Sequence, residues 1–363
     1  MSEDNERLVS LGFPIVVLMD VVVGLGHPAH VHFYRNTIDE LETRGHEVHI
    51  ITKERPLAID LLNAYNIEHE VAGRWRIQHE NPLKTGLSFF SFECDVINTV
   101  RQYSPEVVTG IGNIPLAHAS SIFDCTSLIF TDTEHAAFAN GITFPFSDYI
   151  YTPTCFQLDV GGKQSQYPSY HELAYLHPDR FTPDPGVLDD VGISSDERFV
   201  ILRTVAWNAI HDAGDSGFDS VTEVVDEIED QGVRVLITAE DDLPESLKKY
   251  QISIDPHRIH DLQYYADLFL GESATMAAES AVLGTPSIFV STVSLGYMEE
   301  LEHEYGLISN FSGERRQINA INTAISILEN YDQELWDKRR QTMLDDKINT
   351  TDFIVDQITR TLD

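Results

Sequence analysis

Residues 271–286 limit the folds open to this chain more than any other segment. A short apolar run at residues 267–270 ends at Gly271, apolar residues at helical spacing follow from Ser273, and a Gly-Thr-Pro sequence leads into a second apolar run. This order predicts a strand, a turn, a helix and another strand, which is the repeating unit of parallel α/β sheets. Ser273 falls at the N-cap of the predicted helix, where its hydroxyl can accept a backbone hydrogen bond.

The start of this helix is also a candidate anion site. Backbone N–H groups in a first turn have no partner within the helix, and the helix dipole adds positive charge, so Ser273, Ala274 and Thr275 are predicted to bind a diphosphate. Glu279 lies about two turns further along, a distance that suits a ribose held beyond the phosphates. The alternative is an ordinary cap at Ser273 and a solvent-exposed Glu279.

The rest of the chain repeats this alternation of strand and helix patterns. Its 363 residues exceed one ordinary core and suit two α/β domains. The predicted strands span residues 15–23, 48–52, 67–71, 106–109, 127–130, 199–203, 233–238, 267–270 and 287–290. The predicted helices include residues 31–44, 87–103, 221–230, 274–283, 317–330 and 332–362. The expected fold is α/β, with two Rossmann-like domains whose parallel sheets face a central cleft.

One stretch interrupts the alternation and indicates where the domains join. Residues 151–185 are rich in Gly, Pro and Tyr, which is typical of a connection between domains. We place an N-terminal domain at residues 1–165, a C-terminal domain at residues 166–345, and a last helix at residues 346–363. That helix is expected to pack back on the N-terminal domain.

The charge of the chain argues against one class of partner. There are 59 acidic and 24 basic side chains, a formal charge of −35, and the acids are spread along the whole sequence. A surface without a basic stripe does not suit nucleic acid, and broad adhesion to an anionic membrane is also disfavoured, although one small apolar membrane contact remains open. Dispersed acidity with few lysines is typical of adaptation to a cytoplasm of high salt concentration.

The three cysteines and the apolar runs indicate a cytoplasmic, soluble protein. Cys94, Cys125 and Cys155 lack the spacing of a zinc site and are odd in number, so we expect reduced thiols and no metal or cofactor held by them. The longest apolar run, at residues 15–26, is interrupted by Asp20 and is too short to span a bilayer.

The first predicted strand ends in a segment that combines glycine and histidine. The sequence Gly-Leu-Gly-His-Pro-Ala-His-Val-His-Phe occupies residues 24–33, and it lacks the third glycine of a dinucleotide-binding loop. Gly26 is predicted to allow close approach of a ligand. His27 and His30 can both face the cleft, where one of them can bind substrate or act as a general base because histidine titrates near neutral pH. His32 is expected to point elsewhere. A metal site would need a third ligand that the sequence does not identify, and capping or packing roles stay open.

Further candidates follow strands of both halves. Arg203 leaves the first strand of the second half and suits a phosphate, Trp207 can stack on a base or sugar, and the backbone at Ile259 can meet a nucleobase. Three more ionisable residues follow the fifth strand of the first half, namely Asp132, Glu134 and His135. For each of these residues a surface or packing role remains the alternative.

Several segments carry a resemblance to a known family. They are His-Pro-Ala-His-Val-His-Phe at residues 27–33, Gly-His-Glu-Val at 45–48, Glu-Leu-Ala-Tyr-Leu-His-Pro at 172–178 with Phe181, Arg203 through Trp207 to His211, and residues 275–286. In these segments the chain resembles the GT-B superfamily of nucleotide-sugar enzymes, and within it DUF354, an archaeal and bacterial family without a settled activity. The resemblance covers nearly the whole chain.

The resemblance implies a glycosyltransferase that works without a metal or other cofactor. GT-B relatives hold a UDP-sugar at the turn and glutamate that match Ser273, Ala274, Thr275 and Glu279 here. The first loop is similar to that of a lipid-acceptor transferase, whose proposed base matches His30. The expected partners are a UDP-linked sugar donor in the C-terminal domain and a glycan or lipid-linked acceptor in the N-terminal domain.

Two departures from another relative count against a second activity. The non-hydrolysing UDP-N-acetylglucosamine 2-epimerase has His-Arg-Arg-Glu-Asn after the first strand of its second domain, whereas this chain has Ala-Trp-Asn-Ala at residues 206–209. An acidic residue that follows its fourth strand is matched by Asn113. An epimerase of this type and a non-catalytic nucleotide-sugar-binding protein remain the alternatives to a transferase.

Overall fold

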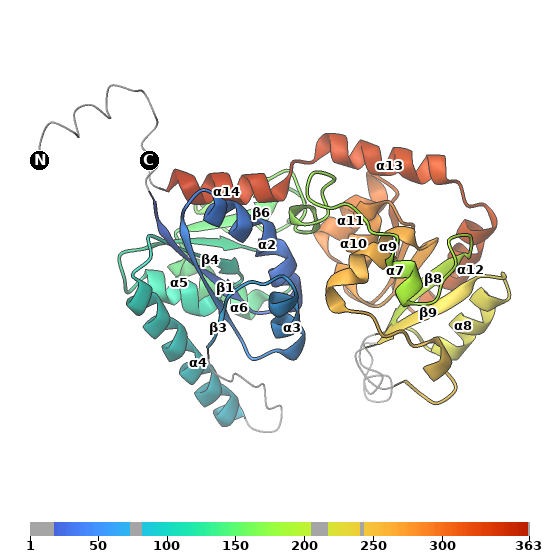
Figure 1. Cartoon of the computed structure of the whole chain (residues 1–363), viewed down its shortest axis with the longest axis horizontal. Coiled ribbons are helices and arrows are strands. Elements are labelled where there is room, and N and C mark those ends of the chain that lie inside the picture. The colour runs from blue at the N-terminus through green and yellow to red at the C-terminus, as the bar shows by residue number, and fades with distance from the viewer. Residues whose placement is uncertain (1–17, 73–81, 205–216, 240–242, 362–363) are drawn as a thin grey trace, which may run out of the picture.

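The computed structural model describes residues 18–72, 82–204, 217–239 and 243–361. Two parallel sheets are formed by these residues, each with helices packed around it (Figure 1). The prediction of two parallel α/β units is confirmed. Trp207, a predicted stacking residue, lies outside the described residues.

The first sheet has the strand order β3-β2-β1-β4-β5-β6-β7, all parallel. Its strands are β1 (Asp20–Leu25), β2 (Glu47–Thr52), β3 (Glu70–Val71), β4 (Val107–Ile111), β5 (Thr126–Phe130), β6 (Tyr149–Pro153) and β7 (Gln164–Tyr167). Its helices are α2 (Pro28–Thr43), α3 (Pro56–Ala64), α4 (Pro82–Tyr103), α5 (Ile114–Ser120) and α6 (Ala137–Thr143), with a 3₁₀ turn η2 (Phe144–Phe146). The inner strand β1 is apolar and buried along almost its full length because helices cover both faces of the sheet.

The second sheet has the order β12-β11-β10-β8-β9, again parallel. Its strands are β8 (Phe199–Thr204), β9 (Arg234–Ala239), β10 (Leu268–Gly271), β11 (Ser287–Val290) and β12 (Ile308–Phe311). The helices are α7 (Val187–Asp190), α8 (Val221–Glu229), α9 (Ile259–Tyr265), α10 (Ala274–Leu283), α11 (Gly296–His303), α12 (Arg316–Glu329) and α13 (Gln333–Asp346). The last helix, α14 (Thr350–Arg360), returns to the first half. The 3₁₀ turns are η3 (Glu172–Ala174), η5 (Lys248–Tyr250) and η6 (Pro256–Arg258).

The carboxyl ends of the two sheets meet where β5 and β6 approach α11. A Cβ atom added to Gly296, the first residue of α11, would lie 2.2 Å from the carbonyl oxygen of Cys155 and 2.7 Å from Oε1 of Glu134. Cys155 follows β6 and Glu134 follows β5. Only glycine fits this contact, so the loops that carry candidate residues of the first half are packed directly against the second half.

The C-terminal segment joins the halves through a break between two helices. The continuous helical pattern predicted at residues 332–362 is wrong, because α13 ends at Asp346 and Asn349 caps a separate α14, near the start of the last helix placed at residues 346–363. At the break, the backbone N–H of Ile348 donates to the carbonyl of Pro168 at 3.1 Å. The chain crosses here from the second sheet to the first, and α14 then packs against α2 (Figure 1).

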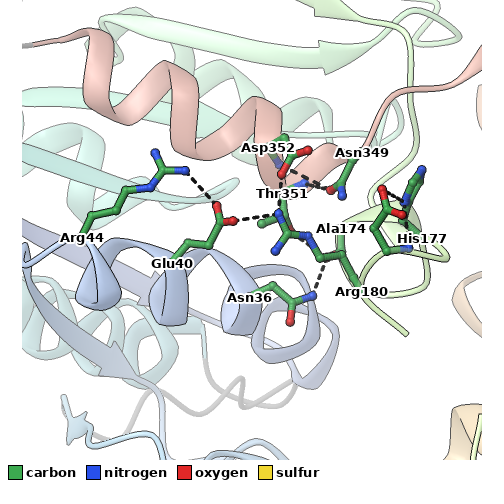
Figure 2. A network of polar contacts seen from close by, with 10 residues as sticks. Asn36, Glu40, Arg44, Ala174, His177, Arg180, Asn349, Thr351 and Asp352 are labelled. Carbon is green, nitrogen blue, oxygen red and sulfur yellow. Dashed lines mark hydrogen bonds and ion pairs between the residues drawn. The ribbon is translucent and has the colours of Figure 1, made fainter. Parts of the chain in front are cut away.

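A polar network fixes α14 in this position (Figure 2). The Arg180 guanidinium lies between the carboxylate of Glu40 on α2, at 2.9 Å, and that of Asp352 on α14. Asn36 of α2 and Thr351 of α14 both donate to the carbonyl of Ala174, at 2.8 and 2.6 Å. The connection after β7 is therefore clamped between α2 and α14, while the domain boundaries at residues 165 and 345 stay a prediction.

No helix in the described part of the chain is long and apolar enough to cross a bilayer.

Candidate functional site

The junction of β10 and α10 has the geometry that its sequence predicts. Ser273 is the N-cap of α10, and its hydroxyl accepts from the backbone N–H of Met276 at 3.4 Å, which confirms the predicted cap. The first bond within the helix runs from the N–H of Ala277 to the carbonyl of Ser273 at 3.0 Å. The amides of Ala274 and Thr275 precede these bonds, so the helix itself offers them no acceptor and they suit an anion.

Arg203 lies beside this junction on the neighbouring strand. It is paired in register with Gly271, and it stands inside β8 as its penultimate residue. A Cβ atom added to Gly271 would be 2.8 Å from Cβ of Arg203 and 2.9 Å from its carbonyl oxygen. The glycine therefore lets the end of β10 approach Arg203 closely.

Glu272, the acidic residue in this turn, has its carboxylate directed at the backbone of the segment before α8. It is 9% exposed, and its Oε1 accepts from the N–H of Phe218 at 2.7 Å. A Cβ atom added to Gly217 would meet this carboxylate at 2.1 Å. The side chain thus has a partner in the protein, which reduces the repulsion that it would exert on a bound anion.

Glu279 is buried, in contrast to the solvent-exposed alternative considered for it. It is 4% exposed, and its Oε1 accepts from the hydroxyl of Tyr175 at 2.8 Å and from Nε2 of His260 at 3.0 Å. His260 follows Ile259, the first residue of α9. The ribose role of Glu279 and the nucleobase contact at Ile259 stay predictions.

His32 joins this network from the first half. It is buried on α2, and its ring lies 4.5 Å from that of His260 and 5.3 Å from that of Tyr175, measured between centroids. Its Nδ1 is 3.2 Å from the hydroxyl of Tyr65. Burial, followed by the charge of His260, lowers the pKa of His32 well below its usual value. The sequence reasoning assigned His32 no role, and the structure makes it part of the contact between the two halves.

The histidines of the first loop take two different positions. His27 is exposed and is the N-cap of α2, with its Nδ1 accepting from the N–H of Ala29 at 3.3 Å. His30 is half-buried, and its Nδ1 accepts from the N–H of Gly26 at 3.1 Å. Burial lowers the pKa of His30 well below its usual value, and the charges of His27, His171 and Lys53 lower it further. The ring is therefore neutral at pH 7.

The bond from Gly26 decides which nitrogen of His30 carries the proton. A backbone N–H can only donate, so Nδ1 holds a lone pair and the neutral ring carries its proton on Nε2. In this arrangement Nε2 of His30 is a hydrogen-bond donor. The predicted base role stays a prediction, and it requires the ring to leave the Gly26 bond.

Asp132, one of the ionisable residues predicted after β5, pairs with a histidine that sequence reasoning missed. Its Oδ2 lies 3.1 Å from Nδ1 of His171, which precedes η3. Burial alone would raise the pKa of Asp132, but the charge of His171 and hydrogen bonds from His171 and Thr133 lower it to about 2. The available signal was a histidine next to a glutamate within an aromatic connection between the sheets, and no motif singled it out.

The two other residues predicted after β5 are Glu134 and His135. Glu134 is half-buried, and its Oε1 accepts from the N–H of Gln157 at 3.3 Å. Burial raises the pKa of Glu134. His135 is exposed.

Three residues whose side chains could bind a metal ion lie at the opposite end of the strands of the first sheet. Among the described residues, Asp20, Glu47 and His49 bring one ligand atom each to within 4.8 Å of one another. Asp20 and Glu47 begin their strands, so the group is at the amino ends and away from the candidate site. That the reaction needs no metal stays a prediction.

Comparison with known proteins places the chain in a sequence family. Residues 19–363 match the family described as "Protein of unknown function (DUF354)". The uncharacterized protein MJ0665 of Methanocaldococcus jannaschii is 22% identical over 286 residues, which cover 75% of this chain and 82% of that protein.

Solved structures with the same arrangement of sheets include two kinds of enzyme. The UDP-GlcNAc 2-epimerase from Neisseria meningitidis bound to UDP-GlcNAc has a TM-score of 0.63 and 14% identity, covering 94% of this chain and 100% of that chain. The Spinosyn Forosaminyltransferase SpnP has a TM-score of 0.65 and 11% identity, covering 96% of this chain and 100% of that chain. These likenesses confirm the predicted GT-B fold, with two Rossmann-like domains facing a central cleft.

Proposed function

The chain belongs to the DUF354 family, whose function is unknown, and from that premise we propose that it is a metal-independent glycosyltransferase. It moves a sugar from a UDP-linked donor to a glycan or lipid-linked acceptor. The C-terminal domain, residues 166–345, takes the donor, and the N-terminal domain, residues 1–165, takes the acceptor. The proposal includes a cytoplasmic location and, from the formal charge of −35, adaptation to high salt.

The β10–α10 junction is the observation that carries this proposal. The two amides of Ala274 and Thr275 precede the first bonds of α10, and Gly271 lets β10 approach Arg203 in the adjacent strand. Helix amides together with a guanidinium provide fixed positive charge for a diphosphate that leaves the sugar. In a metal-independent transferase this charge takes the place of a metal ion. One of the solved structures of the same fold is an epimerase bound to UDP-GlcNAc. This supports our proposal that a nucleotide-sugar binds here.

The first half contributes the groups around the acceptor. His30 is at the start of α2 with a donor Nε2, and Gly26 lies next to it, because a Cβ atom added to Gly26 would lie 3.6 Å from Cε1 of the His30 ring. We propose that Gly26, His27 and His30 contact the substrates. Asn113, which stands where the epimerase relatives have an acid, caps α5 by accepting from the N–H of Leu116 at 3.2 Å. An amide cannot supply acid–base chemistry at that position, which favours transfer over epimerisation.

A glycine substitution tests the donor site. Gly271→Ala places a methyl group against Arg203, and we expect it to weaken UDP binding by about 1–3 kcal/mol because β10 and β8 must move apart. Gly141→Ala in α6 is the matched control, since nothing lies within 4 Å of a Cβ atom there. The measurement is titration calorimetry with UDP, after circular dichroism has shown that both variants are folded. Equal UDP affinity in Gly271→Ala and the parent would contradict the donor site.

A product analysis separates the three functions. The full chain is incubated with UDP-N-acetylglucosamine, UDP-glucose or UDP-galactose, with and without a panel of 4-nitrophenyl glycosides. A transferase yields an extended glycoside and UDP only when the acceptor is present. Conversion of the donor sugar without acceptor would identify an epimerase, and binding without any conversion would leave a nucleotide-sugar-binding protein.

A further inference from the structure

Asp132 and His171 form a directed pair at the carboxyl end of the first sheet. Nδ1 of His171 lies 3.1 Å from Oδ2 of Asp132, and the pKa of that carboxyl is lowered to about 2, so the carboxylate is ionised and must accept. Nδ1 therefore carries a proton, and in the neutral form of the ring the lone pair is on Nε2. This is the opposite arrangement to His30, whose Nδ1 accepts from Gly26 and whose proton is on Nε2.

Nε2 of His171 is buried and has no hydrogen-bond partner among the described residues. The residue is 7% exposed, and its ring lies 4.5 Å from that of Phe33. A buried acceptor without a partner costs free energy, so such atoms are rare in native proteins and are found at functional sites, where a substrate can donate to them. The side chain of Asp132 is 18% exposed, so the pair has access to solvent on the side of Asp132.

Two further buried oxygen atoms near Asp132 have no hydrogen-bond partner within the part of the chain that the structure describes. They are the hydroxyl of Tyr167 and Oε2 of Glu134. The charge of Asp132 acts on the pKa of both residues, which shows that they share its surroundings. Together with Nε2 of His171 these atoms offer acceptors and one phenol. Hydroxyl groups complement such a lining, whereas an anionic group would be repelled by Asp132.

We propose that His171 is the general base for sugar transfer, that Asp132 positions it, and that the acceptor presents a neutral carbohydrate hydroxyl at this place. The inference rests on the proposed function. Nε2 takes the proton of the acceptor hydroxyl while its oxygen forms a bond to the anomeric carbon of the donor. The bond from that carbon to the diphosphate oxygen breaks, and its electron pair stays with the diphosphate. The imidazolium that results is held against the Asp132 carboxylate until it returns the proton to solvent.

His171 touches the reacting hydroxyl in this scheme, and Asp132 acts through it. Asp132 fixes the tautomer and balances the charge that develops on the ring. Nε2 is covered in the structure, so the acceptor enters by displacing side chains around it. His30 then has a different role, because its Nε2–H donates where His171 accepts.

The first test measures the tautomer directly and needs no substrate. The full chain labelled with ¹⁵N-histidine is examined by long-range ¹H–¹⁵N correlation, and signals are assigned by their loss in His171→Gln and His30→Gln. We expect His171 to be protonated on Nδ1 and His30 on Nε2. A His171 ring protonated on Nε2 would overturn the inference, since that atom could not accept a proton.

The second test measures transfer with the donors and glycosides given above. His171→Gln should lower kcat by about 10²–10⁴-fold with the donor KM little changed, and Asp132→Asn should lower it by less. The matched control is His118→Gln, which removes a pair between a histidine of α5 and Glu93 of α4. His118→Gln should retain the parent rate.

A thiol acceptor separates base catalysis from structural damage. Once the reacting hydroxyl is known from the product, its thiol analogue is used at pH 8.5, where a thiol is about half ionised and needs little help from a base. The loss in His171→Gln should then shrink to less than about tenfold, whereas a distorted site would lose the same factor with both acceptors. Full activity of His171→Gln with the hydroxyl acceptor would overturn this inference alone. A parent chain that transfers no sugar would overturn the proposed function, and the inference with it.

Discussion

Glu279 shows how one residue can serve stability and a site at once. Its position on α10 suggests a ribose contact, but its Oε1 already accepts from Tyr175 and His260 in a buried environment. Loss of the carboxylate leaves both donors without that acceptor. A weaker nucleotide affinity in a variant would therefore not by itself prove a ribose contact.

We expect Glu279→Ala to lower the free energy of unfolding by about 2–4 kcal/mol, because two buried donors lose their acceptor. Urea denaturation checks this. Glu227→Ala on the exposed face of α8 is the control and should stay within about 0.5 kcal/mol of the parent. An unfolding curve for Glu279→Ala that overlays the parent would remove the structural role and leave the ribose contact as the reason for a glutamate there.

The histidines give the protein a predictable response to acid. The pKa of His32 is lowered by burial and then by the charges of His260, Arg35, His257 and His27. Unfolded histidine binds a proton near pH 6.5, so below that pH the unfolded state binds more protons than the folded state. The contribution of His32 to the free energy of unfolding should therefore be fully present above about pH 6.5, and it should decrease as the pH falls below that value.

We predict that His32→Gln flattens this decline between pH 7 and 5. One such group contributes a slope of at most about 1.4 kcal/mol per pH unit, and His30 contributes in the same direction. Burial raises the pKa of Glu172, so this residue makes the folded state more stable as the pH falls, opposite to the histidines. The test therefore compares the pH dependence of the variant with that of the parent. Asp132, with a pKa of about 2, matters only in stronger acid. Unfolding at several pH values is the measurement, with His135→Gln as an exposed control, and parallel curves for His32→Gln and the parent would contradict the prediction.

The residues of the site were only partly predictable from the sequence. Ser273 was identifiable because a cap is a local property of four consecutive residues. His171 was not, because its meaning depends on Asp132, which is 39 positions away in a different element. Glu279 was assigned to the right helix, but its burial depends on Tyr175 and His260, which other parts of the chain bring to it.

At the scale of elements, apolar runs predicted the central strands well. The predicted residues 287–290 and 274–283 are β11 and α10 as observed, and β8 extends one residue beyond the prediction. β7 was missed because Gln-Ser-Gln-Tyr has no apolar alternation, and its strand character comes from pairing with β6.

The non-helical residues between α13 and α14 were missed for a related reason. Residues 332–362 keep a helical pattern, but the backbone N–H of Ile348 is bonded to Pro168 in the first half. Asn349 then starts a new helix by accepting from the N–H of Thr351 at 3.1 Å. Tertiary contacts determine where these helices end, and the helix propensity of the local sequence does not predict such contacts.

At the scale of the whole molecule, a formal charge of −35 sets the response to salt. Like charges spread over one surface repel one another and favour the expanded chain. Glu42 illustrates this, because burial and the neighbouring charges of Asp39 and Glu68 raise its pKa. Added salt shortens the range of such repulsion from about 10 Å at 0.1 M to about 3 Å at 1 M.

We therefore predict that the melting temperature rises with potassium chloride, with most of the gain below about 1 M, where screening is nearly complete. Glu42→Gln separates charge screening from a general effect of salt on burial. It removes one member of a repelling group, so it should stabilise the chain in dilute buffer and make little difference at 3 M. Glu245→Gln is the matched control, because it removes a carboxylate that is paired with Lys248 at 2.8 Å and should give no gain in dilute buffer. The measurement is calorimetry of the parent and the two variants from 0.1 to 3 M salt. A melting temperature of the parent that stays flat or falls would contradict adaptation to high salt. A Glu42→Gln gain that persists at 3 M would show that the salt does not act by screening this repulsion.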